Sequence, residues 1–330
     1  INVPISEPLF NYDVATLPIE RCISATSACN DTTVAADVVS MVRQAQRPLL
    51  IIGQETRSNM AEVKAELASL RQQIVVIQDK LSDISDTEPQ LFDAAIAIAE
   101  DAEVLRPDLI IYVGGTLVSK NCKQFLRNCT PIQSVLIDPR GDIRDTFMNL
   151  TTVVQCQSTT FIKILANSLE GFATSKYYHD WQKALKDVTT DAQLYSPTYS
   201  QMLAVRRFHT LLQQNNDLKA LVYGNSSAVR LGNFYSSDYI FVNRGVNGIE
   251  GTLSTAVGMA AANKNKRVFC VIGDLSFFYD QNALWNSNLG ENLSILLLNN
   301  NGGGIFQQLS GLEKSAHRAA IMGVGASVTA

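Results

Sequence analysis

Oxygen-bearing side chains follow two apolar runs near the end of the chain. Asp274 comes after the run Arg267–Ile272 and Gly273, and Asn300 comes after the run Leu293–Leu298. Both runs have the length and apolar character of buried β-strands. Side chains at the carboxyl ends of parallel strands lie at the edge of the sheet where ligands bind in open α/β folds. We therefore expect Asp274 and Asn300 to meet in one site.

Three oxygens of this stretch form a ligand set for a divalent cation. Asp274 offers a carboxylate oxygen, Asn300 an amide oxygen, and Gly302 a backbone carbonyl in the loop Asn299–Gly304. Mg²⁺ takes such oxygens when a substrate diphosphate and water fill its remaining positions. The sequence predicts a metal site that also binds a diphosphate, and it does not distinguish Mg²⁺ from Mn²⁺.

A second glycine-rich stretch, Asn243–Gly251, follows the expected strand Tyr239–Val242. It holds three glycines within the seven positions 245–251, which let the backbone approach a ligand closely. The helix expected over Thr252–Ala262 presents its N-terminus to anions. The alternative is a long turn before a tightly packed alanine-rich helix.

Together the motifs resemble those of the thiamine-diphosphate (ThDP) enzymes. That superfamily opens its metal and diphosphate motif with Gly-Asp-Gly and closes it with Asn-Asn after the next strand. Here Gly273-Asp274-Leu275-Ser276 opens the stretch and Asn299-Asn300-Asn301-Gly302-Gly303 closes it. Leu275 stands where most members have glycine. This form is similar to one branch, the 2-succinyl-5-enolpyruvyl-6-hydroxy-3-cyclohexene-1-carboxylate synthases (MenD) of menaquinone biosynthesis.

The resemblance implies a ThDP- and Mg²⁺-dependent (or Mn²⁺-dependent) transferase. It would decarboxylate 2-oxoglutarate and add the resulting succinyl semialdehyde carbanion to isochorismate by 1,4-addition. The position of Ile249 matches the hydrophobic residue that bends the cofactor into a V shape, and Asp274, Asn300 and Gly302 match the metal ligands. The cofactor-binding positions are Ile249, Gly273, Asp274, Leu275, Ser276, Asn300, Gly302, Gly303, Ile305 and Phe306.

The same resemblance assigns substrate contacts to Arg230, Arg244, Lys120 and Ser226. Arg230 and Arg244 match positions that hold substrate carboxylates, and both substrates are dicarboxylates. The guanidinium fork binds a carboxylate in bidentate fashion, which a lysine cannot do. Lys120 follows the small-residue turn Gly114–Ser119, and a solvated surface lysine is an equal alternative for it. Ser226 matches its position less specifically.

The proton-relay glutamate of the family lies on a separate pyrimidine-binding domain and is contributed across a dimer interface. We find no such domain in this chain and predict no catalytic residue in it. We expect a fragment, inactive alone, of a homodimeric or homotetrameric enzyme. Residues 1–190 would form a central Rossmann-like domain with an extended N-terminal arm and a linker. Residues 191–330 would form a C-terminally incomplete diphosphate-binding domain, in which Ala316–Ala330 matches the family poorly.

The fold class predicted from the whole pattern is α/β, with two doubly wound parallel-sheet domains. Apolar strands alternate with helices in both halves, which indicates parallel sheets covered on both faces. A dinucleotide site in the first half is not expected. Gly53 is followed by Gln54 and not by the Gly-x-Gly-x-x-Gly pattern, and Asp138 with Pro139 is explained as a turn at the end of a strand.

The composition of the chain argues against several other classes of protein, among them nucleic-acid-binding, membrane-spanning and zinc-binding proteins. The chain has 330 residues, 46% hydrophobic and 18% charged, with a net charge of −4 and no basic cluster, which argues against nucleic acid as a partner. No run approaches the roughly 18–20 apolar residues of a membrane span. The six cysteines lack zinc-site spacing and are interpreted as buried thiols in the cytoplasm.

Two alternatives to the synthase remain. One is a ThDP-dependent 2-oxo-acid decarboxylase or acetolactate-synthase-like enzyme, which has less use for two carboxylate-binding arginines. The other is a non-catalytic module that binds ThDP or a nucleotide. Leu275 and the pair Arg230 and Arg244 favour the synthase over the decarboxylase, and the pair Asp274 and Asn300 argues against a non-catalytic module.

Overall fold

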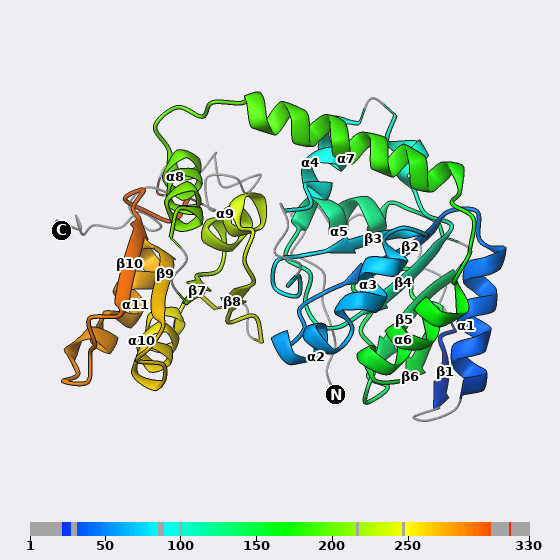
Figure 1. Ribbon diagram of the computed structural model, residues 1–330, viewed down its shortest axis with the longest axis horizontal. Helices are drawn as coiled ribbons and strands as arrows, with labels where there is room; N and C mark the ends of the chain where they lie inside the picture. Colours follow the sequence, from blue (N-terminus) through cyan, green and yellow to red (C-terminus); the bar gives the residue numbers. More distant parts are fainter. Residues whose placement is uncertain are drawn as a thin grey trace.

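The computed structural model describes residues 22–27, 32–84, 89–99, 101–131, 133–215, 218–245, 248–304 and 317. Every structural statement below concerns these residues. They form two parallel sheets, each covered by helices (Figure 1). This arrangement confirms the predicted α/β class.

The first sheet has six strands in the order β1-β6-β5-β4-β2-β3, and all neighbouring pairs are parallel. The strands are β1 (Ser24–Ser27), β2 (Pro48–Ile52), β3 (Val75–Gln78), β4 (Leu109–Val113), β5 (Gln133–Asp138) and β6 (Thr152–Gln155). The helices are α1 (Thr32–Gln44), α2 (Arg57–Glu62), α3 (Lys64–Leu70), α4 (Phe92–Ile98), η1 (Ala102–Leu105), α5 (Lys120–Arg127), α6 (Ser158–Ser168) and α7 (Lys176–Leu194).

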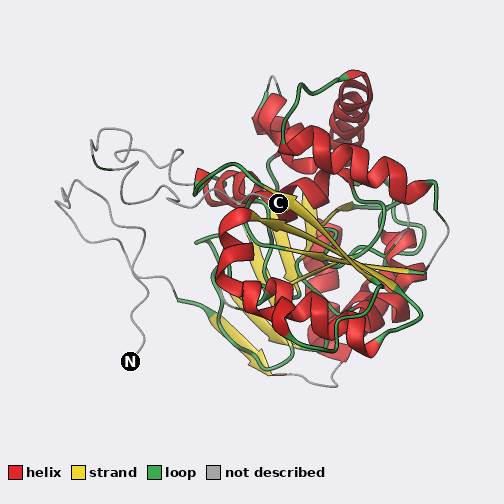
Figure 2. Ribbon diagram, turned by 90° about the vertical axis from the view of Figure 1, so that its left-hand side faces the viewer, coloured by secondary structure: helices red, strands yellow, loops and turns green. Residues whose placement is uncertain are grey.

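Hydrophobic clusters lie on both faces of this sheet, because its strands are apolar on both sides. One cluster joins the strands to α1, α2, α3 and α6, and the other joins them to α4, α5 and α7. Figure 2 shows helices on both sides of the strands. On α7, the Tyr177 hydroxyl and the Trp181 indole N–H both donate to the carbonyl of Leu105, at 3.2 and 3.1 Å. The helix therefore packs against the first sheet and leads on to the second.

The second sheet has four parallel strands in the order β10-β9-β7-β8. They are β7 (Lys219–Tyr223), β8 (Ile240–Val242), β9 (Arg267–Gly273) and β10 (Leu293–Leu298). Its helices are α8 (Gln201–Gln213), α9 (Ser227–Tyr235), α10 (Thr252–Ala262), α11 (Asp274–Asp280) and η2 (Gln281–Trp285). Helices α8 and α9 pack on one face and α10 on the other.

The two sheets share part of one hydrophobic cluster. Leu81, after β3, and Val118, before α5, are buried among residues of α8, α9 and β7. Figure 1 shows α9 and β8 on the side of the second sheet that faces the first. The division at residue 190 stays a prediction, although all strands up to β6 belong to one sheet and all strands from β7 to the other.

Most expected elements are present within a few residues of their predicted bounds, and α10 and β10 match theirs. The sequence Asn59–Arg71 predicts a single helix, but the structure divides this stretch into α2 and α3 at Val63, where φ is −118°. Strands β1 and β6 were not predicted. Both are only four residues long, and their threonine- and serine-containing sequences lack the apolar runs of the central strands.

Gly53 ends β2 by packing directly against a neighbouring turn. A Cβ atom at this position would overlap the carbonyl of Gly115. Asp138 is likewise satisfied within the fold, because it accepts hydrogen bonds from the backbone of Arg140 and pairs with Arg144 at 2.6 Å. Both residues thus have structural roles within the first sheet.

Two further expectations concern the chain as a whole. Among the described cysteines, Cys122, Cys129, Cys156 and Cys270 are buried as expected, whereas the expectation is wrong for Cys22, which is exposed. A search of the described helices found none with the length and apolar character needed to cross a membrane.

Candidate functional site

Asp274 and Asn300 follow neighbouring strands whose ends are in register. In the β9–β10 ladder Leu298 pairs with Gly273, so the residues that follow each strand emerge side by side. Asp274 is the first residue of α11 and only 4% exposed, and its Oδ1 accepts a hydrogen bond from the backbone N–H of Leu275 at 2.8 Å. The carboxylate is thereby fixed at the strand tip, with Oδ2 directed at the loop after β10.

That loop places its backbone and an amide against Asp274. The N–H of Gly302 donates to Asp274 Oδ2 at 3.0 Å. The Asn300 amide lies beside both groups. When it is turned so that its nitrogen faces Asp274, that nitrogen is 3.2 Å from Oδ2 and 2.5 Å from the Gly302 carbonyl oxygen. In the opposite orientation the oxygens of Asp274, Asn300 and Gly302 face one another, and the Gly302 N–H donates to Asp274 Oδ2 at 3.0 Å and to Asn300 Oδ1 at 3.3 Å.

A carboxylate, an amide and a carbonyl oxygen gathered at one sheet edge fit a hard divalent cation. The three predicted ligands, Asp274, Asn300 and Gly302, are therefore close enough to serve one ion. The described part of the chain holds no group of three His, Cys, Asp or Glu residues arranged for a metal. A metal at this edge would depend on amide and backbone oxygens together with its one carboxylate.

A cavity of about 140 Å³ adjoins these groups. It collects residues from the ends of β7, β9 and β10 and from the loop before α10. Of the predicted site residues, its walls include Ser226, Ile249, Gly273, Asp274, Leu275, Ser276, Asn300, Gly302 and Gly303. Residues separated by up to 77 positions (Ser226 and Gly303) thus share one concave surface. Ile305 and Phe306 lie outside the described residues.

The backbone is strained on two sides of this cavity. Ser226 has a φ of +69° and Asn301 a φ of +56°, a backbone conformation that residues other than glycine rarely adopt. Strained residues cluster at binding and catalytic sites, where the surroundings hold them in place. Ser226 precedes α9 and provides no side-chain cap. In the first turn the Val229 N–H donates to the Gly224 carbonyl at 3.0 Å, which leaves the N–H groups of Ser227 and Ala228 for a ligand.

Asn225 was not singled out from the sequence, yet it connects the loops around the cavity. Its amide nitrogen donates to the carbonyl of Asn243 at 2.9 Å and also to the carbonyl of Gly248, next to Ile249. Its Oδ1 accepts from Arg244 Nη1 at 2.9 Å. Asn225 thus fixes both the glycine loop and Arg244. The available signal was the same as for Asn300, an asparagine just after a strand.

Arg230 and Arg244 lie near each other and near Lys123 of α5. Burial, followed by the positive charge of Arg230, lowers the pKa of Arg244. Burial and then Arg244 lower the pKa of Lys123, with Arg127 and Arg230 adding to the effect. The Nε of Arg244 is buried without a hydrogen-bond partner among the described residues. Clustered cations with an unused donor suit an anionic ligand.

Lys120 is placed differently. It is the first residue of α5, exposed to solvent, and it lines neither the cavity at Asp274 nor the larger one described next. Lys123, one turn further along α5, is half-buried and faces the arginines. The role of Lys120 stays a prediction, and Lys123 joins the candidate substrate-binding cations.

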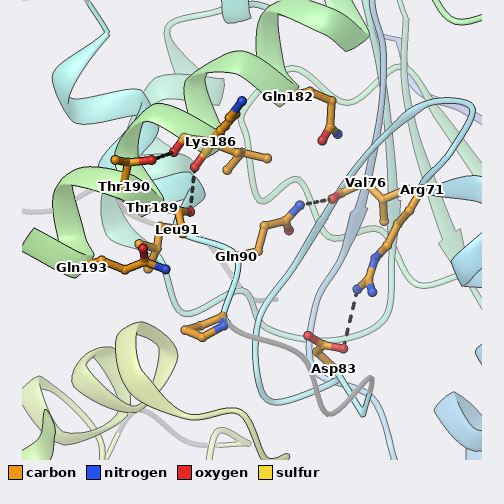
Figure 3. Close-up of a pocket in the computed structure, with 12 residues that line it drawn as sticks. Arg71, Val76, Asp83, Gln90, Leu91, Gln182, Lys186, Thr189, Thr190 and Gln193 are labelled. Carbon is orange, nitrogen blue, oxygen red and sulfur yellow. Dashed lines mark hydrogen bonds and ion pairs between the residues drawn. The ribbon is translucent and has the colours of Figure 1, made fainter.

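A larger cavity, of about 470 Å³, lies elsewhere, between β3, α7 and the segment before α4 (Figure 3). Its polar walls largely bind one another. Arg71 lies 3.6 Å from Asp83, and Gln90 donates to the carbonyl of Val76 at 2.8 Å. No predicted site residue lines it. Size alone therefore does not mark the site, whereas the convergence of motif residues does.

Comparisons with known proteins found one matching family and several similar proteins. Residues 224–322 match the family described as thiamine pyrophosphate enzyme, C-terminal TPP binding domain. The chain is 39% identical to the 2-succinyl-5-enolpyruvyl-6-hydroxy-3-cyclohexene-1-carboxylate synthase of Bacteroides fragilis, and 36% identical to that of Bacteroides thetaiotaomicron. A protein of the same name from Flavobacterium johnsoniae is 33% identical.

The matches cover 94–96% of this chain but only 56–58% of the relatives. The chain thus spans somewhat more than half the length of the curated relatives it matches. The family that residues 224–322 match is the one that the Asp274 and Asn300 motif resembles.

Proposed function

Because this chain is a homologue of the 2-succinyl-5-enolpyruvyl-6-hydroxy-3-cyclohexene-1-carboxylate synthases, with a TPP-binding domain at residues 224–322, we propose that it is part of such a synthase. The complete protein would couple the decarboxylation of 2-oxoglutarate to carbon–carbon bond formation with isochorismate in menaquinone biosynthesis. The observation that carries the proposal is the convergence of Asp274, Asn300, Gly302 and Ile249 on one cavity.

Within this proposal Asp274, Asn300 and the Gly302 carbonyl hold Mg²⁺ or Mn²⁺, and the ion holds the cofactor diphosphate. The cavity formed by the described residues is about 140 Å³, smaller than the roughly 300–1,000 Å³ of whole-ligand pockets, and we assign it to the diphosphate end of the cofactor. When bound, ThDP supplies the electron sink for loss of CO₂ from a 2-oxo acid. The protein supplies position and electrostatics.

Ile249 is proposed to press the cofactor into its bent form. The loop before it is fixed by Asn225, and the helix after it begins at Gly251, whose φ of +78° suits only glycine without strain. Asn243 donates to the Gly251 carbonyl at 3.1 Å and to Thr255 Oγ1 at 2.9 Å. These contacts hold the Ile249 side chain against the cavity.

Arg230 and Arg244 are proposed to bind substrate carboxylates, with Lys123 adding positive charge and Lys120 and Ser226 as further substrate contacts. The fold holds these cations together although they repel one another. A bound dicarboxylate would relieve the repulsion, so the cluster attracts such an anion strongly. A decarboxylase of neutral products has less use for such a cluster, which favours the synthase.

The proposal includes two domains, residues 1–190 and 191–330, and a homodimeric or homotetrameric complete protein in the cytoplasm. Self-association follows from the expectation that the family's glutamate reaches the cofactor across a dimer interface.

The test is an assay of the full-length protein with ThDP and Mg²⁺. Purified protein receives 2-oxoglutarate with isochorismate, and pyruvate alone serves as the control substrate. Product formation that requires both dicarboxylates supports the proposal. Turnover of pyruvate alone would identify a different ThDP enzyme.

A further inference from the structure

Asp79, in the turn after β3, connects two elements that carry proposed substrate-binding cations. It is only 1% exposed. Its Oδ2 accepts a hydrogen bond from the N–H of Val118 at 2.6 Å, and its Oδ1 accepts one from Asn233 Nδ2 at 2.9 Å. Val118 lies two residues before Lys120 at the start of α5, and Asn233 lies on α9 with Arg230. One carboxylate thus bridges the two sheets.

The orientation of Asn233 is determined by a second bond. The backbone N–H of Lys80 donates to Asn233 Oδ1 at 3.1 Å, so its amide nitrogen must face Asp79. The carbonyl of Lys80 accepts from the N–H of Ile240 at 3.1 Å, which adds β8 to the same contact. The turn after β3 is therefore bound to α9 and β8 at several points.

Asn233 and Arg230 are three residues apart on α9, so they lie on the same face of the helix. A small cavity of about 20 Å³ is lined by both of them and by Val118, Ser119 and Asp93. Arg230 therefore lies against the turn that begins α5. A change in the Asp79 contacts would move this helix face relative to that turn.

The residue type suits the position. Both groups that Asp79 binds are N–H donors, and a carboxylate is the short side chain that offers acceptors only. An asparagine in its place would have to direct its own NH₂ group toward either the Val118 N–H or the Asn233 NH₂ group, both of which are donors. Burial raises the pKa of Asp79 to about 7, with Asp93 adding to the effect, and the Val118 N–H, Lys123 and Arg244 oppose it. Burying a carboxylate costs free energy unless hydrogen bonds compensate for the lost water. We therefore expect the two hydrogen bonds of Asp79 to stabilise the contact between α9 and the start of α5.

We propose that Asp79 is a positioning residue for substrate binding. Through its bonds to Asn233 and Val118 it fixes the position of α9, which carries Arg230, relative to the start of α5. The inference rests on the proposed function, because Arg230 and the cations of α5 are assigned there to substrate carboxylates. Asp79 itself lines neither the cavity at Asp274 nor its metal-binding edge.

The experiment compares three variants of the full-length protein. Asp79→Asn keeps the size of the side chain but replaces one acceptor with a donor, and Asn233→Ala removes the partner on α9. Tyr239→Phe is the matched control, because it removes another bond between the two sheets, from Tyr239 Oη to the Glu55 carbonyl at 3.1 Å, without touching α9 or α5.

The readouts are KM and kcat for 2-oxoglutarate and for isochorismate, the Kd of ThDP with Mg²⁺, and the Kd of 2-oxoglutarate by calorimetry without ThDP. Loss of a buried hydrogen-bond partner is expected to raise KM for at least one dicarboxylate about tenfold in both test variants. The Kd of ThDP should change by less than about twofold, since distant sites act independently. Tyr239→Phe should leave all of these values near those of the wild type.

Unchanged KM and Kd values for both dicarboxylates in Asp79→Asn and Asn233→Ala would overturn the inference. So would equal losses of substrate and ThDP binding, or failure of both variants to fold, because either result would show a general structural role. Failure of the proposed function looks different, since the wild-type protein would then not convert 2-oxoglutarate and isochorismate at all.

Discussion

The backbone N–H of Gly302 donates to Asp274 Oδ2 at 3.0 Å, although 28 positions separate the two residues. The parallel pairing of β9 with β10 produces this contact, because it aligns Leu298 with Gly273 and so brings the two following segments together. The cation and diphosphate proposed here depend on this edge of the second sheet, and so does the first prediction.

Replacing Asp274 with alanine removes the single carboxylate of the proposed metal site. We expect metal-dependent ThDP binding to the full-length protein to weaken by about a hundredfold or more, since even residues behind the metal ligands affect affinity by roughly 10–100-fold. Calorimetric titration of ThDP at fixed Mg²⁺ measures this. Asp142→Ala, at an exposed aspartate in the loop between β5 and β6, is the control. Unchanged affinity in Asp274→Ala would show that the assigned site is wrong.

Replacing Arg244 with lysine keeps the charge but removes the planar fork. We expect KM for a dicarboxylate substrate to rise by about tenfold or more, because lysine cannot bind a carboxylate in bidentate fashion or reproduce the bond to Asn225. Steady-state kinetics with each substrate in turn provide the measurement. Arg127→Lys, at an exposed arginine at the end of α5, should leave KM unchanged. Equal KM values in the two variants would remove Arg244 from the substrate site.

Shortening Ile249 to alanine removes the side chain proposed to bend the cofactor while leaving the metal edge intact. We expect kcat to fall by about tenfold to a hundredfold, because small misplacements of reacting groups have effects of that size. The Kd of ThDP should change much less than kcat. Rapid-mixing kinetics and calorimetry on the same preparation separate the two effects. A proportionate loss of binding and turnover would contradict the proposed role.

His209 makes stability depend on pH. Burial, with a smaller effect from Lys219, lowers its pKa from 6.5 to about 4, and its Nε2 lies 2.6 Å from Tyr223 Oη. Between these pH values the unfolded chain binds a proton that the folded chain does not, so stability decreases as pH falls through this window. From pH 7 to pH 5 we expect His209 to contribute a loss of about 2 kcal/mol in unfolding free energy.

Urea unfolding of wild-type and His209→Gln protein at both pH values measures this contribution. The variant should lose less stability on acidification than the wild type by about the same 2 kcal/mol. His179 is exposed, so His179→Gln is the control and should behave as the wild type does. Identical pH dependence in wild-type and His209→Gln protein would show that His209 is not held neutral by the fold.

Local patterns were sufficient for most of the fold. The strand Leu293–Leu298 and the helix Thr252–Ala262 are present as predicted, because a continuous apolar run and a small-residue helix depend on nearby sequence. Strand β6 was missed, since it is a short run, Thr152–Gln155, made a strand by pairing with β5 and β1. The break at Val63 was missed for a related reason. The helical pattern continues through it, and packing decides where the helix divides.

For the site, the sequence by itself determined the chemistry at the strand ends. Asp274, Asn300 and Gly302 could be predicted to meet, because parallel strands bring their carboxyl ends to one edge whatever the side chains are. Only the tertiary structure assigned roles to Asn225, Asp79 and Lys123. Their partners lie on other strands and helices, or on the other sheet, at sequence distances that no local pattern encodes. Contacts of this kind arise from how the two sheets pack, and that packing is the sum of many side-chain fits.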